Sequence, residues 1–258
     1  MKVRIMGAGA SSGVPYVSGD WGRCDPNQPK NKRTRASILI EDKCERIVVD
    51  TGPDFRAQFI ESGSGPIDGV IFTHSHADHV HGIDDVRAIN SMMKKEIPAF
   101  GYEECLTEVA RRFNYVFKPV DPSSRQGWFR PAMTANPIDN GDHKIGDIEF
   151  QIFEQDHGVC RTTGIRIGEI AYSTDVVCLD REALRALKGV KTWIVGCLRR
   201  EGHFVHAGLE QVLSWADFIG PERVILTHMN ATMDYEELLS ELPAGIEPGY
   251  DGLEIIYD

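Results

Sequence analysis

One histidine-rich segment restricts what this chain can fold into more than any other part of the sequence. It spans residues 73–79 and reads Thr-His-Ser-His-Ala-Asp-His. A β-branched and aromatic run precedes it and a helical pattern follows it, which predicts a strand-to-helix turn. A regular strand would point His79 to the opposite face from His74, His76 and Asp78. A turn can instead aim all four side chains at one point.

The side chains in this turn indicate a metal site. Three imidazoles and one carboxylate within six residues are a donor set that suits zinc, manganese or iron. The alternative is a polar surface turn that happens to be rich in histidine, but such turns seldom follow a buried strand. One such segment cannot supply all the ligands of one or two metal ions. Further ligands must therefore come from elsewhere in the chain.

Size and charge limit the classes of protein to consider. A chain of 258 residues with 41% hydrophobic content can bury a sizeable core. No linker or low-complexity block divides it, so we expect one domain over residues 1–258. The formal net charge of −11 argues against a protein whose main role is to bind a long nucleic acid, because that affinity comes from many lysine and arginine contacts to phosphates.

The cysteines and the start of the chain bear on the compartment. Six scattered cysteines without a Cys-x-x-Cys pair fit reduced thiols better than a disulfide framework. The first apolar run is too short for a signal peptide, and no stretch of 18 apolar residues exists. We therefore expect a cytoplasmic protein that does not bind a membrane.

Two loops near the start of the chain have more than one interpretation. The glycine-rich residues 7–15 invite a dinucleotide-binding interpretation, which needs a helix beginning in the loop. Pro15, Gly19 and Gly22 stop such a helix, so we expect a loop that passes close to a ligand. The basic stretch 30–35 is either a solvated loop or a phosphate-binding one, and the sequence leaves both open.

The remaining elements predict an α/β fold. In the first half we expect strands over residues 2–6, 36–41, 45–49, 67–73 and 97–100, with helices over 54–62, 82–93 and 103–113. In the second half we expect strands over 132–138, 144–153, 164–167, 169–173, 192–196 and 223–227, with helices over 181–187, 207–219 and 234–242. Two halves of this kind predict a four-layer αββα sandwich, with two sheets face to face and helices outside.

Three further candidate ligands follow the ends of predicted strands, namely His157, Asp175 and His228. Each alone is a weak signal, because a strand-end aspartate usually caps something and a strand-end histidine usually faces water. With the central turn they supply seven ligands, enough for two ions that share one carboxylate and one hydroxide. Asp50 also ends a strand, and we interpret it as an orienter of metal-bound histidines.

These residues, in this order and each at a strand end, resemble the metallo-β-lactamase superfamily, whose fold is an αββα sandwich. The resemblance implies two divalent metal ions, Mn²⁺ or Zn²⁺. It implies that one ion is held by His74, His76 and His157, that the other is held by Asp78, His79 and His228, and that Asp175 bridges them.

Flanking segments narrow the resemblance to the phosphoribosyl cyclic phosphodiesterases of the carbon-phosphorus lyase pathway. The similar segments are residues 9–15, 206–209, 225–228 and 249–254. That family carries an extra structural zinc built from an N-terminal cysteine cluster and a histidine three residues beyond the last ligand. This chain has only Cys24 in the first region and Ala231 at the later position. We therefore expect this zinc site to be missing.

The sequence thus predicts a dinuclear metal-dependent phosphodiesterase acting on a small anionic phosphodiester, a cyclic phosphate of ribose or a nucleotide. A bridging hydroxide would attack phosphorus. A general acid would protonate the leaving sugar oxygen, an effect of about 10² to 10⁴ in rate. The resemblance implies this acid at His206, while His203 is close enough to compete. We count Asp78 and Asp50 with His206 as catalytic candidates. The alternative is that His206 caps the helix or faces solvent.

Other functions stay open at this point. A transfer-RNA-processing ribonuclease resembles the core but adds an RNA-binding arm, for which no long basic insertion is evident. A thioesterase of the glyoxalase II kind would use seven ligands without an acid at His206, since a thiolate leaves unaided. A non-hydrolytic accessory protein of cofactor synthesis could share the fold. The sequence also leaves a homodimer open.

Overall fold

Two seven-stranded sheets form the centre of the molecule in the computed structural model, which describes residues 1–121 and 128–257. The first sheet contains, in spatial order, β14 (Glu254–Ile256), β1 (Lys2–Gly7), β2 (Ser37–Asp42), β3 (Glu45–Val49), β4 (Gly69–Ile71), β5 (Ile97–Gly101) and β6 (Met133–Pro137). The second contains β13 (Ile246–Pro248), β12 (Arg223–Thr227), β11 (Thr192–Gly196), β10 (Ile170–Ser173), β9 (Arg161–Ile167), β8 (Ile148–Asp156) and β7 (Gly141–Ile145).

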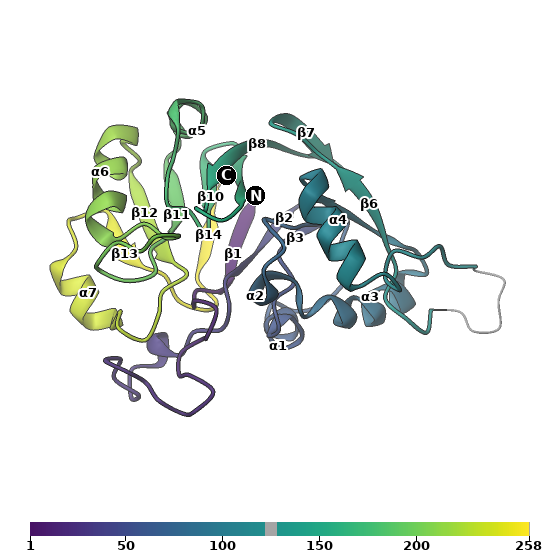
Figure 1. Cartoon of the computed structure of the whole chain (residues 1–258), viewed down its shortest axis with the longest axis horizontal. Coiled ribbons are helices and arrows are strands. Elements are labelled where there is room, and N and C mark those ends of the chain that lie inside the picture. Colours follow the sequence, from purple (N-terminus) through teal and green to yellow (C-terminus); the bar gives the residue numbers. More distant parts are fainter. Residues whose placement is uncertain (122–127, 258) are drawn as a thin grey trace.

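Helices cover the outer faces of the two sheets. They are α1 (Phe55–Glu61), α3 (Val86–Met93), α4 (Glu103–Arg112), α5 (Arg181–Leu187), α6 (Leu209–Ile219) and α7 (Tyr235–Glu241). The single-turn helix α2 (Ala77–Val80) follows β4, and short 3₁₀ turns lie at Pro29–Asn31 and Ile83–Asp85. Figure 1 shows α6 and α7 on one side of the strands and α1, α3 and α4 on the other. Among the described residues, every helix is too short or too polar to span a membrane. The predicted αββα sandwich is confirmed.

Burial on both faces explains why the central strands are apolar without interruption. On β11, Ile194 belongs to the large cluster between the sheets, which also contains Ile71 of the first sheet. Its neighbours Trp193 and Val195 belong to the cluster under α5, α6 and α7. Successive side chains of a strand point to opposite faces, so a strand with a layer on each side is apolar at every position.

One predicted strand is wrong. We expected a single strand over residues 144–153, but β7 ends at Ile145 and β8 begins at Ile148. Gly146 has a φ of +58°, a left-handed conformation that glycine adopts without steric cost, and with Asp147 it forms a two-residue hairpin turn. The apolar residues on either side of the turn hide this boundary from a pattern-based prediction.

Two predicted helices begin later than expected. The pattern over residues 82–93 is divided into the 3₁₀ turn Ile83–Asp85 and α3. The helix predicted over 207–219 begins at Leu209, with Gly208 as its N-cap. The residues before it therefore belong to a loop, which brings them to the end of the sheet where the candidate site lies.

The C-terminal segment joins both N-terminal loops through one carboxylate. Asp251 Oδ1 accepts a hydrogen bond from the backbone N–H of Ala8 at 2.9 Å. Its Oδ2 accepts bonds from the backbone N–H and the hydroxyl of Thr34, at 2.8 and 2.6 Å. Burial raises the pKa of Asp251 to about 6, against the opposing effect of the Thr34 bonds.

We expect Asp251→Ala to lower the free energy of unfolding by roughly 2–5 kcal/mol, because it leaves two backbone donors without their acceptor. The measurement is urea unfolding. The wild type also binds a proton more tightly when folded, so this contribution is present below pH about 4 and is lost as pH rises through about 6. Asp251→Asn cannot titrate, so the stability difference between wild type and Asp251→Asn should shift in favour of wild type from pH 7 to pH 5. An unchanged difference would contradict the titration.

Candidate metal centre

The seven side chains predicted as ligands lie together at one end of the two sheets. The structure gathers them into two groups, His74, His76, His157 and Asp175, and Asp78, His79, Asp175 and His228. Within each group, one nitrogen or carboxylate oxygen per residue lies within 4.8 Å of all the others. These are the groups among the described residues that could hold an ion. That they bind metal stays a prediction.

Strand pairing explains why distant residues meet here. β3 and β4 are parallel, as are β10, β11 and β12. Parallel strands place their carboxyl ends at the same edge of a sheet, and Asp50, Asp175 and His228 follow such ends. All three have a positive φ, +65°, +48° and +54°. Non-glycine residues rarely adopt this conformation, and it recurs at functional sites, where the chain must turn sharply.

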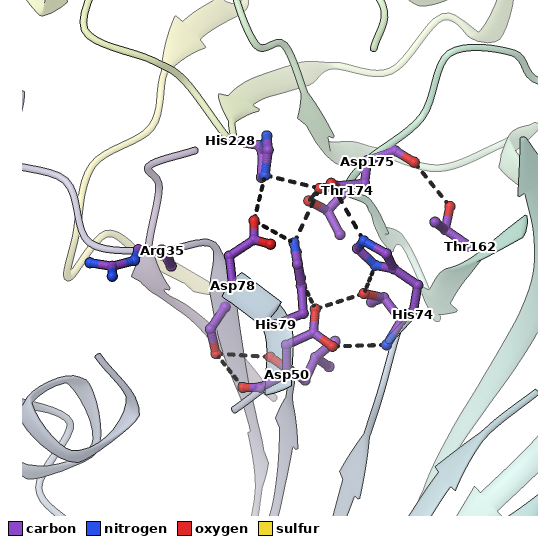
Figure 2. Close-up of polar contacts among 12 residues, drawn as sticks. Arg35, Asp50, His74, Asp78, His79, Thr162, Thr174, Asp175 and His228 are labelled. Carbon is purple, nitrogen blue, oxygen red and sulfur yellow. Dashed lines mark hydrogen bonds and ion pairs between the residues drawn. The ribbon is translucent and has the colours of Figure 1, made fainter. Parts of the chain in front are cut away.

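Asp175 is the residue common to both groups. Its Oδ2 lies 3.6 Å from Nε2 of His74 and 3.6 Å from Nε2 of His157. Its Oδ1 lies 3.1 Å from Nε2 of His228 and 3.4 Å from Nε2 of His79. One carboxylate oxygen therefore faces each group. Figure 2 shows the Asp175 carboxylate between His228, His79 and His74.

The histidine tautomers fit metal binding. A hydrogen bond occupies Nδ1 of His74, to the Thr73 hydroxyl at 3.0 Å, and Nδ1 of His157, to the Val205 carbonyl at 2.6 Å. The Nε2 atoms of His74 and His79 are buried without a hydrogen-bond partner. A buried polar atom without a partner is unfavourable by roughly 1–3 kcal/mol. A cation between these Nε2 atoms and the carboxylates would give the nitrogen atoms a partner. The residues present therefore fit a divalent metal ion.

Asp50 lies directly behind His79. It is fully buried, and its Oδ2 lies 2.7 Å from Nδ1 of His79. It accepts bonds from the backbone N–H and the hydroxyl of Thr73, at 2.8 and 2.7 Å. Its contacts are those of a positioning residue and not of a group that touches substrate. Thr73 was missed by the sequence analysis, although a hydroxyl directly before the first histidine was a signal for this role.

The charges in the cluster attract cations. Burial favours neutral His79, but Asp175, Asp50 and Asp78 outweigh it and raise the pKa of His79 well above its usual value. Burial also opposes the ionised form of Asp175, yet His228 and His79 hold the pKa of that carboxyl well below its usual range. Asp175 and Asp78 thus stay ionised and draw positive charge to a site that water does not screen.

Asp50→Asn should lower the affinity of the site for Zn²⁺ about 10- to 100-fold. The new amide would donate to Nδ1 of His79 and leave the ring proton on Nε2, where it blocks metal binding. Metal content after dialysis against graded chelator measures the effect, with Asp142→Asn, an exposed carboxylate on β7, as the matched control. Equal metal retention in both variants would show that Asp50 has no orienting role.

His206 lies against both ligand groups. Its ring centroid is 4.8 Å from that of His157 and 5.0 Å from that of His228. His203 lies one ring further out, 5.8 Å from His206. Burial, assisted by His228, lowers the pKa of His206 to about 3. Because Gly208 caps α6, the helix-capping role considered for His206 is wrong.

The basic stretch 30–35 is tied into the structure. Lys30 Nζ donates to the Tyr235 hydroxyl at 2.9 Å and lies over that ring. Arg33 is buried and donates to a backbone carbonyl at 2.7 Å. Arg35 pairs with Asp54 at 3.1 Å. These contacts favour a structural role for the stretch over phosphate binding.

Cys24 and Ala231, the positions where the sequence departs from the resembled phosphodiesterases, lie in one small apolar cluster with Val14. The backbone N–H of Arg23 donates to the Ala231 carbonyl at 2.7 Å. Apolar packing and backbone pairing thus hold the N-terminal loop against the segment that follows His228.

Curated relatives match this chain over all or most of its length. An octanoyltransferase of Porphyromonas gingivalis strain W83 is 32% identical over 265 residues, which cover 100% of this chain and 52% of that protein. A ribonuclease Z of Thermococcus kodakarensis is 26% identical over 200 residues, which cover 76% of this chain and 59% of that protein. The chain therefore spans between about half and three-fifths of the length of these two relatives.

A solved structure and a family pattern agree with the fold and the cluster. The crystal structure of a diphosphatase from the PhnP family is 26% identical, with a TM-score of 0.90 over 100% of this chain and 98% of that one. Residues 45–229 match the β-lactamase superfamily domain. Since the matched segment begins in β3 and ends just after His228, and so contains every residue of the cluster, the chain belongs to the metallo-β-lactamase superfamily, as its sequence predicted.

Proposed function

We propose that this protein is a metal-dependent hydrolase that cleaves a small phosphodiester, with a cyclic phosphate of ribose or of a nucleotide as substrate. The observation that carries the proposal is Asp175, whose two oxygens face two separate groups of donors. Two-metal sites built on a shared carboxylate recur in enzymes that transfer phosphoryl groups.

Each ion would have its own set of ligands. His74, His76 and His157 would hold one, Asp78, His79 and His228 the other, and Asp175 both. Bound there, two divalent ions, Mn²⁺ or Zn²⁺, would lower the pKa of a water molecule and polarise a phosphoryl oxygen. Asp50 and Thr73 hold the His79 and His74 rings with Nε2 facing inward.

His206 supplies the proton for the leaving oxygen. Its ring touches a member of each ligand group, so a diester lying across the cluster would have a bridging oxygen beside it. Burial keeps the ring neutral in the absence of an anion, and a bound phosphate favours the protonated form. We assign His206, and not the outer His203, as the general acid, and Asp78 as a ligand.

The relatives support phosphoryl chemistry. The PhnP-family neighbour is named a diphosphatase and the Thermococcus relative a ribonuclease. The Porphyromonas relative is named for an acyl transfer, which makes an acyl thioester the relevant second candidate substrate.

The test compares substrates on metal-loaded protein. The set contains a 2′,3′-cyclic nucleotide, a base-free ribose cyclic phosphate, a nucleoside diphosphate, a phosphomonoester, a precursor transfer RNA and an octanoyl thioester. We expect cleavage of the cyclic diesters, and no cleavage of the monoester or the thioester. Preference for the thioester, or for the RNA over every small diester, would overturn the proposal.

A further inference from the structure

An exposed phenylalanine stands at the edge of the metal centre. Phe204 occupies the tip of a tight turn in which the backbone N–H of His203 donates to the His206 carbonyl at 3.0 Å and the reverse bond is 3.4 Å. Its side chain is 77% exposed. The His203 ring lies 4.4 Å from it, centroid to centroid. The His203 ring thus contacts the Phe204 ring at a tilt of 42°, and much of the Phe204 surface is open to solvent.

This turn is held in place by the ligand loop. The carbonyl oxygen of Val205 accepts a hydrogen bond from Nδ1 of His157 at 2.6 Å. Gly158 packs so tightly against the turn that a Cβ there would lie 2.6 Å from the Phe204 carbonyl oxygen. The next residue, Val159, is 63% exposed. Phe204 and Val159 therefore stand on two touching loops, one carrying a metal-ligand candidate and the other the candidate acid.

Phe204 is unusual for its position. Tight two-residue turns favour glycine, asparagine and aspartate. A single exposed apolar side chain needs no explanation. Two of them stand on touching loops that also carry His157 and His206.

We propose that Phe204 and Val159 form a platform on which the base of a nucleotide substrate stacks, so that the site cleaves nucleotide diesters with a higher kcat/KM than base-free sugar phosphates. This inference rests on the proposed function. An open ring offers a flat face but no enclosing walls. An aliphatic group gains little there, since apolar ligands need enclosure. A base needs only a face, because its planar π-system stacks on one aromatic side chain.

The test uses matched pairs of ligands and of variants. The variants Phe204→Ala and Phe204→Tyr are each loaded with metal. So is the control Phe218→Ala, which removes another exposed phenylalanine, on α6 (61% exposed). For each, kcat/KM is measured on a 2′,3′-cyclic nucleotide and on the base-free ribose cyclic phosphate. Equilibrium binding of adenosine monophosphate and of ribose 5-phosphate is measured alongside by calorimetry.

We expect Phe204→Ala to lower kcat/KM for the nucleotide and its affinity for adenosine monophosphate roughly 5- to 150-fold, with less than a twofold effect on the base-free ligands. Tyrosine should restore both, and Phe218→Ala should match wild type. Equal losses on the nucleotide and the base-free ligand, or no loss on either, would overturn the platform. So would a Phe204→Ala variant that changes oligomeric state but keeps its nucleotide affinity. Failure of every diester with intact, Phe204-dependent nucleotide binding would reject the proposed reaction and keep the platform.

Discussion

Asp175→Ala should remove the metal centre as a unit, lowering bound metal from two ions to one or fewer and hydrolysis of a cyclic diester by about 10³-fold or more. The reason is that its two oxygens face different donor groups, so that one substitution takes an anionic ligand from both. The two cations would then repel each other without a bridging carboxylate between them.

Metal analysis of the purified variant measures this effect together with initial rates on the cyclic substrate. Circular dichroism tests whether the variant keeps the fold. Asp142→Asn serves as the control because the Asp142 carboxylate lies exposed on β7. A variant that holds two ions and turns over at the wild-type rate would remove Asp175 from the centre and, with it, the proposed two-ion site.

His206→Ala should lower kcat on a cyclic ribose phosphate by about 10²- to 10⁴-fold, which is the usual contribution of a general acid. The variant should keep its full metal content, since His206 lies beside the candidate ligands but belongs to neither ligand group. The decisive comparison is a diester with a nitrophenolate leaving group. That anion leaves without a proton, so its hydrolysis should fall far less.

Two further variants make the assignment specific. His203→Ala tests the competing histidine, which lies one ring further from the cluster, and it should affect the rate much less than His206→Ala. His81→Ala is the control, since this exposed ring packs against Phe113. If both leaving groups lost the same factor in His206→Ala, the residue would act in binding or positioning and not as the acid.

Local patterns predicted most of the elements and all of the donors. β-branched runs marked β3, β4 and β12, because strands packed on both faces are apolar throughout. The donors were found by position, each polar residue following the end of such a run. The prediction failed at residues 144–153, where Gly146 interrupts an apolar stretch with a turn, and at the start of α6, where Gly208 delays the helix.

The sequence analysis did not predict the contacts between distant segments. Arg33 and Lys30 looked like part of a basic surface loop, yet Arg33 is buried and Lys30 lies against Tyr235, some 200 residues away. The role of Thr73 depends on Asp50, and the exposure of Phe204 depends on how its loop meets Gly158. No periodicity within a window of ten or twenty residues carries this information.

The sequence by itself determined most strands and helices, the types of the candidate ligands and their place at strand ends, because burial and backbone preference act over a few residues. Only the tertiary structure decided that Oδ2 of Asp78 lies 3.5 Å from Nε2 of His228, a residue 150 positions away. It alone also decided that the Asp175 carboxylate faces both groups of candidate ligands. The physical reason is that strand order and the pairing of two sheets set which strand ends share an edge, and that order results from packing of the whole core.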